Sequence, residues 1–377
     1  MGNSAPFRQD SPEKAQIALM SYARNMNIRP GNSSKNGQSG ERELLRSLRA
    51  QAAGRSRGGL RLGIGDDCAL LAPRAGEELA VTTDLSIAGR HFRLDWHSPE
   101  SVGHRALARG LSDLAAMGAR PVAAFLSLGV PRELTADRRG GCWVDRFLKG
   151  LLDLAAAYKT PLAGGDLAES PLAVADIVLV GAVERGKALL RSGARPGDLL
   201  FVSGVLGGAA CGLKRLEEFA GNLHKEEEGK APTAPQPPRI PKRLEALLAP
   251  HLRPQPRIAQ GMWLRKRGLA SAALDISDGL STDLAHLCEE SGVAAEIDTA
   301  SLPLAPGTSL ELALHGGEDY ELLFTAPAAT RLPRSIQGVA ITPIGRILKA
   351  RAGQPAITLV GGQGRAPLAV RGWEHFS

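Results

Sequence analysis

The sequence predicts a mixed α/β fold built as two domains, and two features of the chain lead to this prediction. Short apolar segments closed by Gly, Pro or Asp are typical of strands, and longer amphipathic segments lie between several of them. The steady βαβ rhythm with one Gly-rich turn that marks a dinucleotide fold does not occur in the sequence. With 377 residues, the chain is long enough for two ordinary domains.

Seven short apolar segments are predicted to form strands. They are Leu79–Thr83, Val122–Val130, Ile177–Val183, Leu199–Ser203, Ala272–Asp275, Tyr320–Thr325 and Val339–Ile347. The clearest predicted helix is Ser98–Met117, with Ser98 as the N-cap and Gly118 as the stop signal. Its buried stripe is expected to consist of Val102, Ala106, Leu107, Leu111 and Leu114.

The chain divides into a tail and two domains. Residues 1–59 are expected to form a disordered or loosely attached tail. Residues 60–190 are expected to form the N-terminal domain, and residues 191–377 the C-terminal domain. A segment at about 221–256 carries a charged run and eight prolines, which we expect no compact helix or sheet to absorb, so it is interpreted as a surface insertion.

Charge and composition limit the classes of partner. Residues 1–62 hold eleven Lys/Arg against four Asp/Glu, which accounts for the whole net charge of +7. The remainder is balanced, so we expect no nucleic-acid partner. No apolar run approaches the roughly 18 residues of a membrane span, and we expect a cytoplasmic protein without membrane contact. The four cysteines lack C-x-x-C spacing, which argues against a zinc site or a disulfide framework.

Seven aspartates stand out by their settings. Most follow a predicted strand or lie in a glycine-lined loop, where a carboxylate at the edge of the core suits a hard cation. They are Asp66, Asp67, Asp84, Asp113, Asp166, Asp275 and Asp278. Asp113 differs because it lies inside the predicted helix amid apolar neighbours, so it requires a counter-charge. For each residue, a helix cap or turn aspartate remains an alternative, but so large a cluster indicates several Mg²⁺ ions and a polyphosphate ligand.

Two glycine-containing turns offer backbone donors for phosphate. Gly204–Gly208 and Ser277–Gly279 each open a predicted helix, and helix N-termini bind anions. A simple tight turn is the alternative for both. P-loop, Rossmann and protein-kinase motifs do not occur in the sequence.

Seven motifs, taken in order, resemble those of the thiamine-monophosphate kinase family. The motifs are Gly63–Leu71, Thr83-Asp84 with Gly89–Phe92, Leu111–Ala119, Gly164–Asp166, Arg191–Asp198, Leu274–Leu280 and Gly316–Leu322. The resemblance runs from about residue 60 to the C-terminus and omits the tail and the Pro-rich segment.

This resemblance implies the two-domain fold of aminoimidazole ribonucleotide synthetase, with the N-terminal domain forming the interface of a homodimer. It also implies a kinase that transfers the γ-phosphoryl group of ATP to thiamine monophosphate with the help of several Mg²⁺ ions. The implied metal ligands are Asp67, Thr82, Thr83, Asp84, Asp113, Asp166, Asp275 and Asp278. The implied ATP contacts are Gly165, Arg191 and Ser277, and the implied contacts to thiamine are His91, Glu318 and Trp373. Catalysis is assigned to Asp84, Asp113, Asp278 and Arg191.

Physical chemistry supports some of these roles and leaves others open. The guanidinium of Arg191 can bind phosphate oxygens in a fork. Trp373 can stack on a cationic ring or serve as a packing anchor, and His91 can be a ligand or a structural histidine. The chain departs from the family pattern at Leu167, Ala168 and Gly110, which affects local hydrogen bonds rather than the carboxylates.

The expected mechanism is direct in-line transfer without a covalent intermediate. The acceptor phosphate has a second pKa of about 6, so it is mostly a dianion at neutral pH and requires no general base. Two other functions remain open. One is an enzyme of the same superfamily with a different acceptor, although selenophosphate chemistry would require a reactive Cys before Cys68. The other is a non-catalytic nucleotide-binding or thiamine-phosphate-binding protein.

Overall fold

The structure is a computed structural model, and it describes most of the chain after the tail. The described residues are 59–64, 68–136, 141–226, 237–362 and 364–373. All of them belong to one compact unit, Ser39–Ser377. Among them, no helix is both long enough and apolar enough to cross a bilayer. Asp66, Asp67 and nearly all of the predicted tail lie outside the described residues.

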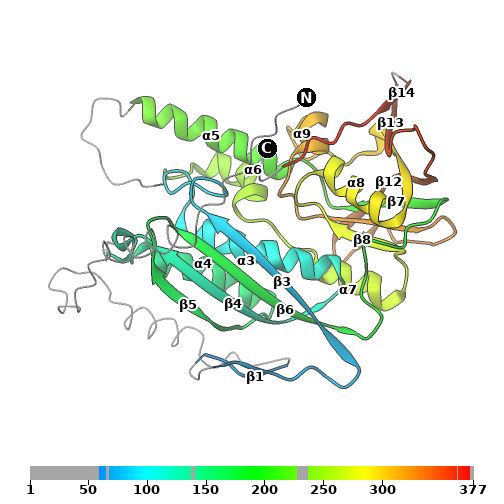
Figure 1. Ribbon diagram of the computed structural model, residues 1–377. Helices are drawn as coiled ribbons and strands as arrows, with labels where there is room; N and C mark the ends of the chain where they lie inside the picture. The colour runs from blue at the N-terminus through cyan, green and yellow to red at the C-terminus, as the bar shows by residue number, and fades with distance from the viewer. Residues whose placement is uncertain (1–58, 65–67, 137–140, 227–236, 363, 374–377) are drawn as a thin grey trace, which may run out of the picture. The chain divides into compact units, whose positions relative to one another are not determined.

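The first sheet has the order β3-β6-β4-β5 within the described residues (Figure 1). Its strands are β3 (Glu77–Ile87), β4 (Arg120–Val130), β5 (Leu162–Glu169) and β6 (Val174–Glu184). β6 pairs antiparallel with β3 and β4, whereas β4 and β5 are parallel. The helices α3 (Pro99–Ala116) and α4 (Trp143–Ala157) pack on one face of this sheet. The same part of the chain contains a 3₁₀ turn, η1 (Arg132–Thr135), and a hairpin of β1 (Leu60–Leu62) and β2 (Leu70–Leu71).

Helix α3 forms as its sequence predicts. The Ser98 hydroxyl accepts a hydrogen bond from the Ser101 backbone N–H at 3.2 Å, and Pro99 begins the helix. The helix ends at Ala116, and Gly118 follows with φ 64°. The predicted stripe is buried, but so is almost every other side of the helix, because α4, the first sheet and strand β8 (Ala272–Asp275) of the second sheet all pack against it.

Two glycines let the backbones of α3 and α4 approach closely. A Cβ atom added at Gly103 would lie 2.0 Å from the Phe147 carbonyl oxygen, and one added at Gly150 would lie 1.9 Å from the Glu100 carbonyl oxygen. No side chain fits at either distance, so the helix pair requires glycine at both positions.

The second sheet has the order β14-β13-β9-β12-β7-β10-β8, with β11 beside β12, within the described residues. Its strands are β7 (Asp198–Ser203), β8 (Ala272–Asp275), β9 (Val293–Asp298), β10 (Leu322–Pro327), β11 (Ser335–Ile336), β12 (Val339–Lys349), β13 (Ile357–Gly361) and β14 (Gly364–Pro367). Its helices are α5 (Gly208–Glu226), α6 (Lys242–Leu252), α7 (Ile258–Arg267), α8 (Leu280–Ser291) and α9 (Leu310–His315), with a 3₁₀ turn η2 (Thr299–Ser301). The mixed sheets confirm the predicted fold class. Described strands before residue 190 contribute to the first sheet or the hairpin, and those after it to the second sheet.

All seven predicted strands are present, but only β8 has the predicted bounds, and one prediction begins too early. Tyr320 has φ 51° and belongs to a loop, so β10 begins at Leu322. Among the described strands, the prediction missed β1, β2, β5, β9, β11, β13 and β14. β5 was missed because Gly164 and Gly165 break its apolar pattern, and glycine weakens a strand prediction.

The Pro-rich segment is not free of regular structure, which corrects the sequence interpretation. Helix α5 extends to Glu226 and helix α6 covers Lys242–Leu252, on either side of the undescribed residues 227–236. Helix α6 tolerates two of the prolines, because Pro241 is its N-cap and Pro250 lies near its C-terminal end. Moreover, α6 buries the side chains of Leu248, His251 and Leu252, so part of this segment belongs to the protein interior.

Candidate active site

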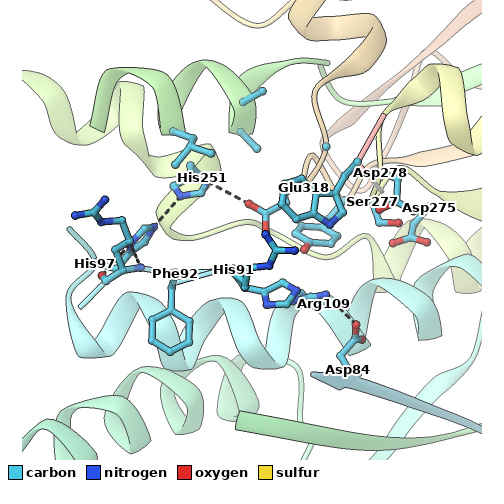
Figure 2. A pocket seen from close by; sticks show the side chains of 18 of the residues that line it. Asp84, His91, Phe92, His97, Arg109, His251, Asp275, Ser277, Asp278 and Glu318 are labelled. Atoms are coloured by element: carbon cyan, nitrogen blue, oxygen red, sulfur yellow. Dashed lines mark hydrogen bonds and ion pairs between the residues drawn. The ribbon is translucent and has the colours of Figure 1, made fainter. Parts of the chain in front are cut away.

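A pocket of about 460 Å³ opens among α3, the β3–α3 loop, the β8–α8 loop and the loop before β10 (Figure 2). Eight of the predicted site residues line it. They are Asp84, His91, Asp113, Asp275, Ser277, Asp278, Glu318 and Trp373. Residues that are distant in sequence, some from the first sheet and some from the second, therefore face one cavity.

One part of the pocket is a cluster of carboxylates. Asp84 lies on β3 and its Oδ1 atom is 3.5 Å from Nη2 of Arg109 on α3 (Figure 2). The Thr82 hydroxyl donates a hydrogen bond to Asp113, and the Ser112 hydroxyl donates one to Asp275 at 2.6 Å. These hydroxyl groups fix the orientation of carboxylates that would otherwise rotate.

The buried carboxylates repel one another. Burial raises the pKa of Asp84 to about 7, with an opposing effect of Arg109 and further increases from Asp113 and Asp176. Burial also raises the pKa of Asp275 well above its ordinary value, and Asp113 raises it further. The pKa of Asp113 is raised by burial as well, although the Thr82 hydroxyl and nearby Arg191 oppose this rise. The cluster therefore favours a bound proton or a cation at its oxygen atoms.

This donor set suits a divalent cation. Carboxylate oxygens are the ligands that Mg²⁺ prefers, and Mg²⁺ usually keeps several waters and takes only one or two protein carboxylates. In the arrangement described, no three His, Cys, Asp or Glu side chains of the described residues converge closely enough to hold one ion together.

A second part of the pocket is aromatic and basic. His91 accepts a hydrogen bond from the Ile87 backbone N–H at Nδ1, at 3.1 Å, which fixes its ring. Phe92 stacks on Trp143 with ring centroids 6.5 Å apart, and the Arg93 guanidinium lies 4.2 Å from the centroid of the Trp96 ring. The Trp373 side chain is 47 % exposed and lines the pocket, while its backbone N–H donates to the Asp278 carbonyl at 3.0 Å.

The loop that carries Glu318 has an unusual backbone. Glu318 and Tyr320 have φ values of 67° and 51°, a region that non-glycine residues rarely adopt. Two backbone hydrogen bonds to the β8–α8 loop hold the conformation, from Glu318 N–H to the Ser277 carbonyl at 2.8 Å and from Tyr320 N–H to the Ile276 carbonyl at 2.9 Å. The two pocket loops therefore support each other.

Arg105 binds the Glu318 carboxylate. Its Nη2 atom lies 2.6 Å and 2.7 Å from the two carboxylate oxygens. Burial alone would raise the pKa of Glu318, but Arg105 and the adjacent His251 outweigh burial and lower the pKa far below its usual range. Glu318 is therefore ionised in the pocket.

The two predicted phosphate-binding turns are already occupied by carboxylates of the chain itself, which corrects that prediction. Asp283 accepts hydrogen bonds from three consecutive N–H groups, those of Ser277, Asp278 and Gly279, at 3.0 to 3.1 Å. At the start of α5, the Asp319 carboxylate accepts hydrogen bonds from the N–H groups of Gly207 and Ala209. The amide groups that were expected to bind phosphate therefore bind Asp283 and Asp319.

Several predicted site residues do not line the pocket. Gly165 and Asp166 lie exposed on β5, and Arg191 is exposed but close enough to affect the pKa of Asp113. Thr82 acts through its hydrogen bond to Asp113, whereas strand alternation directs the Thr83 side chain to the opposite face of β3. Asp67 lies outside the described residues.

The sequence analysis missed several charged or histidine side chains of the site, among them Arg105, Arg109, His97 and His251. Arg105 and Arg109 precede Asp113 at four-residue spacing, so they share one face of a predicted helix and were detectable. His97 and His251 are 154 positions apart, and their side chains are in contact only in the folded chain. No local pattern would have paired them.

Comparison with known proteins places this fold and pocket in a defined class. Residues 65–184 match the family described as "AIR synthase related protein, N-terminal domain". The crystal structure of hydrogenase maturation protein HypE in complex with ATP, at 16% identity and a TM-score of 0.61, shares the fold and covers 90% of this chain. The chain therefore has the architecture of the AIR synthase-related proteins.

Closer relatives define the family within that class. The thiamine-monophosphate kinase of Escherichia coli K12 is 38% identical over 341 residues, which are 85% of this chain and 94% of the relative. That of Bacillus subtilis is 32% identical and covers 84% and 93% of the two chains. The crystal structure of the Stenotrophomonas maltophilia K279a enzyme has a TM-score of 0.69 at 38% identity, with 84% and 95% covered. A structure of AaThiL complexed with AMPPCP and TMP has a TM-score of 0.65 at 32% identity, with 89% and 97% covered. The chain belongs to the thiamine-monophosphate kinase family.

Proposed function

We propose that this protein transfers the γ-phosphoryl group of ATP to thiamine monophosphate, giving thiamine diphosphate and ADP. The observation that carries the proposal is a single pocket that joins a buried carboxylate cluster to an aromatic part containing an ionised glutamate. Membership of the kinase family supports it, and so does a relative that binds both AMPPCP, an ATP analogue, and thiamine monophosphate.

Within the pocket, the carboxylate cluster would hold the metal ions and the polyphosphate. Asp84, Asp113, Asp275 and Asp278 are the described residues that would hold Mg²⁺, with Asp67 and Asp166 as further expected ligands. When bound, Mg²⁺ supplies positive charge that neutralises phosphate oxygens. The ATP contacts proposed from the sequence are Gly165, Arg191 and Ser277, of which Ser277 lines the pocket. Thr82 and Thr83 are further ligands expected from the family resemblance.

The aromatic part would bind the thiamine moiety. Glu318 is ionised and faces the pocket, so it complements a cationic thiazolium ring or an aminopyrimidine donor. Trp373 offers an exposed indole face for stacking, and His91 lies nearby with a fixed ring. These roles follow from the family resemblance and agree with the chemistry of the described side chains.

The residues of the chain act in transfer by positioning and charge. The acceptor phosphate is already a dianion near neutral pH, with a second pKa of about 6, so no side chain has to remove a proton. Arg109 adds positive charge beside Asp84, and Arg191 adds it near Asp113. Two anions held in line with their mutual repulsion reduced can react directly.

We further propose that the protein is a homodimer that associates through β3. This strand is at the edge of the first sheet, and one of its faces points away from α3. On that face the side chains of Leu79, Val81 and Leu85 are 43%, 61% and 46% exposed. An exposed apolar strip on an edge strand is typical of a surface covered by a partner. A cytoplasmic location and the lack of a nucleic-acid partner remain predictions from the sequence.

The test is an assay of the purified protein with ATP, Mg²⁺ and thiamine monophosphate, with the products separated by chromatography. Equal amounts of thiamine diphosphate and ADP are expected. ADP without thiamine diphosphate would indicate a different acceptor within the superfamily. Binding of both substrates without turnover would indicate a sensor rather than a kinase.

A further inference from the structure

Two buried histidines connect the backbone of the β3–α3 loop to Glu318. His97 and His251 are each 2% exposed, and their Nε2 atoms are 3.0 Å apart (Figure 2). On the far side of His97, its Nδ1 atom lies 3.1 Å from the Arg93 backbone nitrogen. On the far side of His251, its Nδ1 atom lies 3.3 Å from a Glu318 carboxylate oxygen. The four groups form a continuous row from Arg93 to Glu318.

The chemistry at the two ends of this row fixes both tautomers. The Arg93 N–H group can only donate, so Nδ1 of His97 accepts and the proton of that ring is on Nε2. That proton points to Nε2 of His251, which therefore accepts and leaves the His251 proton on Nδ1, facing Glu318. The reverse assignment would let His97 donate to the Arg93 carbonyl at 3.2 Å, but it would place a bare nitrogen lone pair of His251 against the carboxylate.

Both rings are neutral in this arrangement. Burial, with Arg105 and His251 adding to its effect, lowers the pKa of His97 to about 2. Burial and Arg105 also lower the pKa of His251, although Glu318 opposes this effect. Neutral rings have one proton each, so the row has a direction.

Glu318 needs this support because its own backbone is strained. A residue with φ 67° keeps that conformation only when its surroundings hold it. Arg105 and His251 contact the carboxylate from α3 and α6, and together they restrict it to one orientation toward the pocket.

The segment that carries His251 is itself anchored to the helices of the first sheet. His104 of α3 has its Nε2 atom 2.8 Å from the Pro254 carbonyl oxygen. The Tyr158 hydroxyl donates to the Pro256 carbonyl at 2.9 Å. Proline cannot donate through its backbone, but its carbonyl oxygen accepts, so this segment forms a fixed wall beside His251.

We propose that His97, His251 and Arg105 are positioning residues that hold the Glu318 carboxylate for the cationic or amine-bearing part of the substrate. The end of the Pro-rich segment is thereby a determinant of substrate affinity, although its sequence resembles an insertion. For the identity of the substrate, the inference rests on the proposed kinase function. The row of contacts itself is a property of the ligand-free protein and is testable without any activity.

The first experiment reads the tautomers directly. Long-range ¹H–¹⁵N spectra of the full-length protein with ¹⁵N-labelled histidine identify which ring nitrogen is protonated, and H97F and H251F spectra assign the signals. We expect His97 to be neutral and protonated at Nε2, and His251 to be neutral and protonated at Nδ1. Any other pattern overturns the row, whether or not the protein is a kinase.

The second experiment separates positioning from general stability. In His251→Phe, the KM for thiamine monophosphate should rise about tenfold, the size expected when a polar contact to a charged group is lost, while kcat and the KM for ATP stay within about twofold. His251→Asn keeps a donor at the place of Nδ1 and should restore most of the affinity. The control is Leu148→Ala, which removes a buried side chain of α4 outside the pocket and should lower stability while leaving the KM for thiamine monophosphate unchanged.

Two results would overturn the positioning role. One is a wild-type KM for thiamine monophosphate in His251→Phe, and the other is an equal rise of that KM in Leu148→Ala. If the protein phosphorylates a different acceptor, the proposed function fails, but the spectra still decide whether the row exists.

Discussion

Replacing Asp84 by asparagine removes one charge from the carboxylate cluster with little change in side-chain shape. Burial raises the pKa of Asp84 from 3.8 to about 7, Arg109 opposes the rise, and Asp113 adds to it. At about 1.4 kcal/mol for each pKa unit, this rise corresponds to roughly 4 kcal/mol of cost for the ionised form in the folded state. In the absence of divalent cations, Asp84→Asn should therefore unfold at higher temperature than the wild type at pH 8, while losing activity.

The gain in stability of Asp84→Asn over the wild type should increase with pH. Below about pH 4 both the folded and the unfolded states hold the proton, so the wild type and the variant have similar stability. Between about pH 4 and pH 7 the unfolded state of the wild type releases the proton and the folded state keeps it, so wild-type stability falls. Above pH 7 the full difference of up to roughly 4 kcal/mol is present.

The assay is thermal and urea unfolding at pH 4 and pH 8 in a chelator, repeated with Mg²⁺. At pH 8 in the chelator, the Tm of Asp84→Asn should be on the order of 5 °C above that of the wild type. Mg²⁺ should reduce this difference in Tm, because it strongly stabilises only the wild type. The control is Asp153→Asn, an exposed aspartate on α4, which should change neither midpoint by much. Equal stabilities of Asp84→Asn and wild type at pH 8 in the chelator would refute the reasoning.

Three further outcomes are expected. Asp278→Asn should reduce turnover more than about a hundredfold with an unchanged circular dichroism spectrum, because a pocket carboxylate contributes charge rather than packing; near-normal turnover would show that this carboxylate is not a metal ligand. Val81→Asp should shift the protein toward monomer in light scattering with size-exclusion chromatography, since the charge would be buried at the proposed interface; an unchanged mass would exclude this face. Gly150→Ala should lower stability by about 3 kcal/mol or more in urea unfolding, because its Cβ would lie 1.9 Å from the Glu100 carbonyl oxygen; a neutral result would mean that α3 and α4 can separate without cost.

Local sequence signals were sufficient to predict much of the fold. The N-cap, the first-turn proline and the terminal glycine of helix α3 all lie in or directly beside the helix in sequence, so both of its ends were predictable. The seven predicted strands are apolar and bounded by turn residues, and each is present. The fold class followed from their alternation with helices. Strand β5 was not predicted, because its central glycines leave no apolar pattern to detect.

The carboxylates of the site were also predictable, because each has a local setting that suits a ligand. Long-range partners were not. Asp319 accepts from Gly207, 112 positions earlier, so the sequence could not show that the start of α5 is already bonded. Asp283 lies only four residues after Gly279, and its capping role was detectable. His97 and His251 needed the folded chain to bring them together.

Internal carboxylates at the starts of α5 and α8 have a consequence for how the protein meets a nucleotide. Because Asp319 and Asp283 already satisfy those amide groups, both loops keep their shape before any ligand arrives, and binding does not have to order them. Cations from solution and arginine side chains then supply the electrostatic attraction for a polyphosphate. Affinity for the nucleotide should accordingly weaken as ionic strength rises, more steeply than in proteins whose glycine loops wrap the phosphates.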